Sequence, residues 1–243
     1  GYSQGNIKIS GNGPHSSQFI LDKYGVESMP RKESFQWADV VILGIKPQIF
    51  AESEDELKSY SIQARTGQIV VSLMAGVNTL SLSQVFESQE VVRTMPNLPI
   101  DIGRGTTSVC VDGLSEQALK DVCNIFNTAG TTVNIPERLM DTATALAGSL
   151  PAFVFQFAEG LIAGGVKEGM PRLQAEQLAL TTLAGSAELL LQSKKSPSDL
   201  TAAVCSPGGT TIAGVYTMEE EGVKAALMKT ISATTQRSRE LGA

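Results

Sequence analysis

One short segment of the sequence combines residue types that could hold an anion: Ser206-Pro207-Gly208-Gly209-Thr210-Thr211. The Pro-Gly pair predicts a rigid turn, and the second glycine lets a ligand approach the backbone closely. Unpaired N–H groups at the start of the following helix favour a negative group such as a carboxylate, and two threonine hydroxyls add donors. An ordinary turn between two helices fits the same six residues and, judged on the turn alone, is the more common case.

The residues that most hydrolytic chemistry needs are missing. His15 is the single histidine and lies in a loop-like stretch, where a surface position is the usual explanation. No Ser-His-Asp set and no metal-binding cluster is present. Cys110, Cys123 and Cys205 are too few and too scattered for a disulfide framework or a zinc site, which favours a reducing compartment. We therefore expect no metal and no hydrolase.

Composition excludes further classes of protein. Of the 243 residues, 42% are hydrophobic and 18% charged, so a sizeable core is expected. The net charge of −6 comes without any basic stripe, which argues against a nucleic-acid partner. No uninterrupted run of ~18 apolar residues and no signal peptide is visible, so we expect no membrane partner and a cytoplasmic protein. The chain starts at Gly1 without a methionine, which leaves a preceding segment open.

The first 135 residues alternate strand-like and helix-like runs. This order predicts an α/β, Rossmann-like domain with a mainly parallel sheet and right-handed crossovers. The expected strands are Asn6–Ser10, Asp39–Ile45, Gln68–Leu73, Glu90–Arg93, Thr106–Val111 and Thr131–Ile135. The expected helices are Ser16–Tyr24, Glu52–Ala64, Thr79–Phe86 and Ser115–Thr128, the first ending at Gly25 and the last capped by Ser115.

Residues 136–243 carry apolar residues at helical spacing throughout and predict an all-helical domain. Prolines stand where helices should begin, at positions 151, 171 and 197. The helices are rich in alanine and glycine, which allows close helix contacts and leaves broad apolar faces. A homodimer through these faces is favoured over a monomeric bundle. The expected helices are Glu137–Ala147, Ala152–Glu168, Leu173–Gln192 and Gly222–Leu241.

Six stretches in a fixed order resemble the pyrroline-5-carboxylate reductase family. They are GIKPQ at 44–48, SLMAGV at 72–77, VVRTMPNLP at 91–99, MDTATALAGSLPAF at 140–153, GVKEGMPR at 165–172, and LTAAVCSPGGTTIAGVYTME at 200–219. The resemblance implies an NAD(P)H-dependent reductase that converts the cyclic imine 1-pyrroline-5-carboxylate to L-proline. It also implies a homodimer through the helical domain, often assembled into a larger ring.

The resemblance also assigns site residues. Thr144 would lie near the imine nitrogen, and the substrate carboxylate would be held by Ser206, Gly208, Gly209, Thr210 and Thr211. The loops facing the cofactor would contribute Lys46, Pro47, Gln48, Ala75, Gly76, Met95, Pro96 and Asn97. Imine reduction suits a site without histidine, because the nicotinamide supplies the hydride and a basic imine arrives partly protonated. Thr144 is then expected to orient the substrate rather than to act as a general acid.

The cofactor loop at the N-terminal side departs from the family. Relatives carry a glycine-rich dinucleotide loop after a first strand, and this chain is expected to begin beyond that point. Gly11-Asn12-Gly13 is a weak imitation of that loop and fits better the strand end that reads the adenosine ribose. Ser10 and Asn12 there are compatible with NADPH, although the arginine expected beside them is missing; NADH stays compatible too.

The sequence differs from the family at two positions near the expected substrate site, and two other functions are considered. Leu150 and Phe153 stand where the family has glycine and tyrosine, which leaves a related cyclic imine open as the substrate. β-Hydroxyacid dehydrogenases need a lysine on the first helix of the second domain, and residues 137–160 contain none. The other rival is a non-catalytic or ligand-sensing relative of the reductases.

Overall fold

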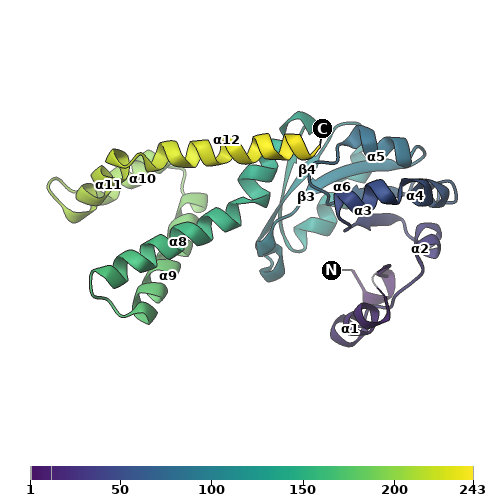
Figure 1. The fold of residues 1–243 in the computed structure, drawn as a ribbon, viewed down its shortest axis with the longest axis horizontal. Helices are drawn as coiled ribbons and strands as arrows, with labels where there is room; N and C mark the ends of the chain where they lie inside the picture. The colour runs from purple at the N-terminus through teal and green to yellow at the C-terminus, as the bar shows by residue number, and fades with distance from the viewer. Residues whose placement is uncertain (1, 12, 243) are drawn as a thin grey trace. The chain divides into compact units, whose positions relative to one another are not determined.

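The computed structural model describes residues 2–11 and 13–242, which form two compact units. The sheet unit runs to Gly148 and includes the chain again from Thr234 on; the helical unit spans Ser149–Ala233 (Figure 1). The helical segment after Pro136 and the end of the last helix thus pack with the sheet. The domain boundary predicted at residue 135 follows the last strand and stays a prediction.

The sheet has five strands in the order of the chain: β1 (Val40–Leu43), β2 (Ile69–Ser72), β3 (Glu90–Met95), β4 (Gly105–Cys110) and β5 (Gly130–Ile135). Strands β1 to β3 are parallel, and β5 is parallel to β4, which confirms the predicted mainly parallel sheet. The pairing of β3 with β4 is antiparallel. Only residues 96–104 connect these two strands, fewer than the dozen or so that a parallel crossover requires.

The strand predicted at Asn6–Ser10 is wrong as an element of the sheet. Residues Gln4–Asn6 form a short 3-10 helix (η1), and the segment afterwards makes a single β-bridge between Ile9 and Ser28. No residue of Asn6–Ser10 is fully buried, so little apolar burial favours a longer pairing. The following helix α1 (Pro14–Tyr24) ends as predicted at Gly25, whose φ of 66° is left-handed.

Helices on both sides of the sheet bury two apolar clusters. The remaining helices that pack around the strands are α2 (Arg31–Trp37), α3 (Pro47–Glu52), α4 (Glu54–Ser61), α5 (Thr79–Val85) and α6 (Glu116–Asn127). Phe35, Phe50 and Phe86 fill one cluster, while Val92 and Val122 belong to the other. Ser115 caps α6 by accepting the N–H of Ala118 at 3.1 Å, as predicted.

The segment after β5 carries the predicted Thr144 and stays in the sheet unit. It consists of a 3-10 turn η3 (Glu137–Leu139), one turn of α-helix α7 (Met140–Ala143) and a π-helical turn η4 (Thr144–Gly148). Beside it lies the end of α12 (Val223–Leu241), where Ser238 donates a hydrogen bond to Asp141 at 2.8 Å.

The helical unit contains α8 (Leu150–Lys167), α9 (Arg172–Gln192), α10 (Pro197–Val204), α11 (Thr210–Glu220) and the first part of α12. Helices α8 and α9 lie side by side (Figure 1). Few of its side chains are buried, and many large apolar ones are exposed, among them Phe155, Leu161, Leu189 and Leu191. Judged by length and mean hydropathy, the stretch 137–167 would suffice to cross a membrane, although it contains no uninterrupted apolar run of that length.

Candidate functional site

The predicted cofactor loops meet at one edge of the sheet. Strands β1, β2 and β3 are parallel and in register, so that Leu43, Ser72 and Arg93 stand side by side. All eight residues assigned to the cofactor on this edge lie at the end of one of these strands, in the loop that follows it, or at the start of the next helix. The carboxyl edge of a parallel sheet is where doubly wound folds bind dinucleotides. The geometry therefore brings the three loops together, while their contact with a cofactor stays a prediction.

Three of these residues have distinct surroundings. The side chain of Lys46 is exposed at the start of α3 and has no ion-pair partner among the residues described. Ala75 packs against a small buried cluster that contains Met95. Gly76 has a φ of 78°, and a Cβ there would lie 3.0 Å from the carbonyl carbon of Leu241. Gly76 is thus required by the close approach of the end of α12, a packing reason that the sequence did not reveal.

Thr144 begins the π-helical turn and uses its hydroxyl hydrogen internally. Its Oγ1 donates to the carbonyl of Met140 at 2.9 Å, because a carbonyl can only accept. The oxygen keeps its lone pairs, so Thr144 can accept a hydrogen bond from a ligand. π-Helical turns inside helices are frequent at functional sites.

Asn97 ties this turn to the sheet. Its side-chain Nδ2 donates to the carbonyl of Ala147 at 3.2 Å, and its Oδ1 accepts the N–H of Thr106 at 2.8 Å. Both polar atoms of the carboxamide are therefore used within the protein. The contact of Asn97 with the cofactor stays a prediction.

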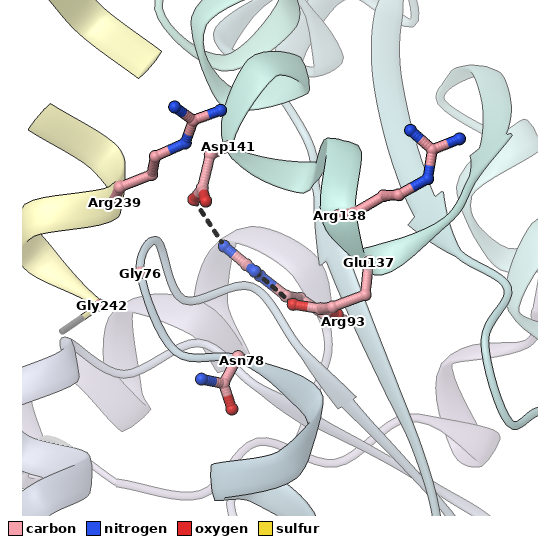
Figure 2. Close-up of a pocket in the computed structure, with 8 residues that line it drawn as sticks. All are labelled: Gly76, Asn78, Arg93, Glu137, Arg138, Asp141, Arg239 and Gly242. Carbon is pink, nitrogen blue, oxygen red and sulfur yellow. Dashed lines mark hydrogen bonds and ion pairs between the residues drawn. The ribbon is translucent and has the colours of Figure 1, made fainter. Parts of the chain in front are cut away.

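A buried ionic cluster beside the turn was not foreseen. The guanidinium of Arg93, whose side chain is 3% exposed, lies 2.5 Å from a carboxylate oxygen of Glu137 and 3.5 Å from one of Asp141. Figure 2 shows the three side chains converging, whereas Arg138 and Arg239 point away from Arg93. These residues line a cavity of about 310 Å³. An arginine directly after Val91 and Val92 in a predicted strand was the available signal, since a charge is rarely buried without a partner.

A second cavity adjoins the predicted ribose site. It has a volume of about 300 Å³ and is lined by Ser10 together with Ser17, Ser28 and Arg31. Arg31 makes an exposed ion pair with Glu56 at 3.4 Å, which engages one of its five N–H donors. The structure thus places an arginine near Ser10 that the sequence motif lacked, and Asn12 lies outside the described residues.

The predicted anion-binding turn has the expected local geometry within the helical unit. The N–H of Gly209 bonds to the carbonyl of Ser206 at 3.0 Å, with Gly208 at a φ of 68° in the third position. This is the pattern of a type II turn, which favours proline second and glycine third. Gly209 is the N-cap residue of α11 and has no side chain that could accept a hydrogen bond from the helix. The first N–H groups of α11 are therefore free to bind a ligand. Thr210 and Thr211 are exposed beside them.

Comparisons with known proteins decide the family. Two relatives are named pyrroline-5-carboxylate reductase. That of Synechocystis is 35% identical over 94% of this chain and 86% of its own length, and that of Aquifex aeolicus is 39% identical over 84% and 76%. The chain belongs to the pyrroline-5-carboxylate reductase family. The predicted resemblance is thereby confirmed.

Domain models and a solved structure agree with this assignment. Residues 137–241 match the model described as pyrroline-5-carboxylate reductase dimerisation, and residues 2–76 match the model of NADP oxidoreductases that are coenzyme F420-dependent. The crystal structure of the Plasmodium falciparum pyrroline carboxylate reductase with NADP bound has a TM-score of 0.86 and 29% identity. The superposition covers 99% of this chain and 89% of the Plasmodium falciparum chain. The predicted fold, a Rossmann-like sheet followed by a helical dimerisation region, is confirmed.

Proposed function

We propose that this protein reduces 1-pyrroline-5-carboxylate to L-proline with NADPH. The observation that carries the proposal is the family membership over nearly the whole chain, with relatives of that name at 35% and 39% identity. Two features of the structure support it. Three loops come together at the carboxyl edge of the sheet, and the helix that begins after Gly209 has no side-chain cap. The missing lysine within residues 137–160 speaks against a hydroxyacid substrate.

The chemistry asks the protein to position its substrate. When bound, the reduced nicotinamide supplies the hydride, which adds to the carbon of the C=N bond. The substrate nitrogen arrives protonated and keeps that proton, so the product is the ring amine and no protein acid is required. Thr144 accepts the N–H of this iminium, because its own hydrogen is bound to Met140. Holding the ring in one orientation is the main source of rate.

The turn at Ser206–Gly209 holds the substrate carboxylate. The N–H groups at the start of α11 and the hydroxyls of Thr210 and Thr211 supply donors, and none of the residues described caps this helix with a side chain. A carboxylate also interacts favourably with the positive end of the helix dipole. Any side chain at Gly209 would obstruct the turn, because its Cβ would come within 2.3 Å of the hydroxyl of Ser206.

The cavity around Ser10 supports NADPH over NADH. NADPH differs from NADH by a phosphate on the adenosine ribose, which carries charge and strong acceptors. Three serine hydroxyls and the guanidinium of Arg31 line the cavity, and arginine suits phosphate because its planar fork donates two parallel hydrogen bonds. Arg31 thus takes the part of the arginine that is absent at the strand end.

The exposed apolar side chains of the helical unit support a homodimer. Phe155, Leu161, Leu189 and Leu191 are all more than a third exposed, and exposed apolar patches of this kind mark association surfaces. Assembly of dimers into a ring and a cytoplasmic location accompany the proposal as predictions.

Initial rates of cofactor oxidation test the substrate. The protein should oxidise NADPH with 1-pyrroline-5-carboxylate and much less with the six-membered imine 1-piperideine-6-carboxylate. A higher rate with the six-membered ring would mean that Leu150 and Phe153 have shifted the substrate. No turnover with either imine would favour the ligand-sensing relative.

A further inference from the structure

Alternate residues of one strand hold the segment that carries Thr144. Side chains two apart along an extended chain lie on the same face. Arg93, Met95 and Asn97 have this spacing, and the backbone is still extended at Asn97, with φ −131° and ψ 167°. All three side chains contact the segment Glu137–Gly148.

The three contacts are distributed along the whole segment. Arg93 pairs with Glu137 and Asp141 at its start. Met95 lies against Gly148 at its end, where a Cβ would be only 3.3 Å from the Met95 sulfur. Asn97 binds the Ala147 carbonyl, one residue earlier. Met95 and Asn97 therefore hold the end of the π-helical turn, while Arg93, from the same extended stretch of chain, holds the helical turn that precedes it.

We propose that Asn97 and Arg93 are positioning residues that set the orientation of the Thr144 hydroxyl. This inference rests on the proposed function, in which Thr144 touches the substrate nitrogen. The Ala147 carbonyl lacks the partner that a regular α-helix would give it, because the residue four positions later is Pro151, which has no N–H. Asn97 supplies such a partner to Ala147 and is itself fixed by Thr106 of β4. Arg93 fixes the helical turn that precedes Thr144. That turn contains Met140, whose carbonyl accepts the hydrogen of the Thr144 hydroxyl.

A double-mutant cycle tests the proposal. Asn97→Ala should lower kcat by about 10- to 100-fold, since small misplacements at a reacting centre have effects of that size. The cofactor dissociation constant should change by less than about twofold, because the side chain faces inward. In the double variant with Thr144→Val, kcat should equal that of Thr144→Val alone, since Asn97 then has no hydroxyl to position. The proposal would be overturned if the double variant lost the product of the two single-variant reductions in kcat. An unchanged kcat in Asn97→Ala would also overturn it.

A matched control separates positioning from stability. Asn127, at the end of α6, also accepts the N–H of a strand residue, Thr132, at 3.0 Å, but among the residues described its side chain makes no hydrogen bond to Glu137–Gly148. Asn127→Ala should lower the melting temperature and leave kcat unchanged. If Asn97→Ala does not fold, Gly148→Ala takes its place in the cycle, because the added methyl would press against Met95 and shift the same turn.

Hydrogen exchange tests the same inference without any turnover. In the protein free of cofactor and substrate, amides of residues 140–150 should exchange faster in Asn97→Ala than in the wild type. Unchanged exchange there would contradict the inference even in an active enzyme. A wild type that reduces no imine, with faster exchange in the variant, would refute the proposed function and keep the holding role of Asn97.

Discussion

The guanidinium of Arg93 lies 2.5 Å from the carboxylate of Glu137, which is 44 residues further along the chain. This contact joins strand β3 to the segment that begins right after β5. Asp141, one helical turn beyond Glu137, completes the cluster and also accepts a hydrogen bond from Ser238 of α12. The fold thus gathers three distant parts of the chain around one buried cation.

Replacement of Arg93 by methionine should destabilise the protein strongly. The variant leaves Glu137 and Asp141 partly buried without their cation, and removing one partner of a buried ion pair typically costs about 3–5 kcal/mol. Urea unfolding measures the loss. Arg93→Lys keeps the charge and should lose less, and the pair Arg93→Met with Glu137→Gln should lose less than the sum of the single losses. Equal stability of Arg93→Met and wild type would contradict the cluster's role.

Replacement of Arg31 by alanine should weaken the preference for NADPH. Loss of one charged hydrogen-bond donor to a phosphate predicts a KM for NADPH about tenfold higher, while the KM for NADH should stay within about twofold. Lys32→Ala is the control, since it removes the same charge from the same helix but does not line the cavity. Parallel changes of both cofactor constants in Arg31→Ala would place the phosphate elsewhere.

Replacement of Thr211 by alanine should affect the imine more than the cofactor. Its hydroxyl belongs to the open start of α11, so the KM for 1-pyrroline-5-carboxylate should rise about tenfold with little change for NADPH. Thr217→Ala serves as the control on the same helix, because that hydroxyl is bound to the carbonyl of Ala213. Equal increases of both constants would count against the site at the turn.

The buried thiol of Cys110 predicts a loss of stability in alkali. Burial raises the pKa of Cys110 from its ordinary value of 9.0 to about 12. The raised pKa means that the folded protein keeps the proton while the unfolded chain releases it above pH 9. The free energy of unfolding is therefore unaffected by this thiol below pH 9 and falls between pH 9 and about 12, by at most about 1.4 kcal/mol per pH unit.

Urea unfolding between pH 8 and 10.5 checks this prediction. Cys110→Ala should show a flatter decline of stability above pH 9 than the wild type, and the comparison cancels the titration of lysines and tyrosines. Declines of equal slope in the two proteins would mean that the thiol does not contribute.

The first two strands of the sheet could be predicted because they are short, nearly continuous apolar runs. Val40–Leu43 is a continuous apolar run between a polar residue and a glycine, which is enough to indicate a strand, although Ile42 on this edge strand is 45% exposed. The antiparallel step between β3 and β4 was missed because it depends on the length of one connection. Helix α2 was also missed, since seven mostly exposed residues give too little periodicity to detect.

The site was predictable where it consists of contiguous motifs. The turn at Ser206–Gly209 could be proposed from its local chemistry, and the loops after β1 to β3 were assigned through the resemblance of their motifs to the family. The partners of Arg93 were not, because Glu137 and Asp141 reach it only through the packing of a later segment. Arg31 was missed for a similar reason, because its cavity forms only where the segments 10–17 and 28–31 come together.

Transfer of an isotope label tests the central claim most directly. The protein is incubated with 1-pyrroline-5-carboxylate and NADPH that carries deuterium at the transferable position of the nicotinamide, and the product is examined by NMR. The proposed function predicts L-proline with one deuterium at Cδ, the former imine carbon, in amounts equal to the cofactor oxidised. Oxidised cofactor without labelled proline, or no oxidation at all, would contradict it.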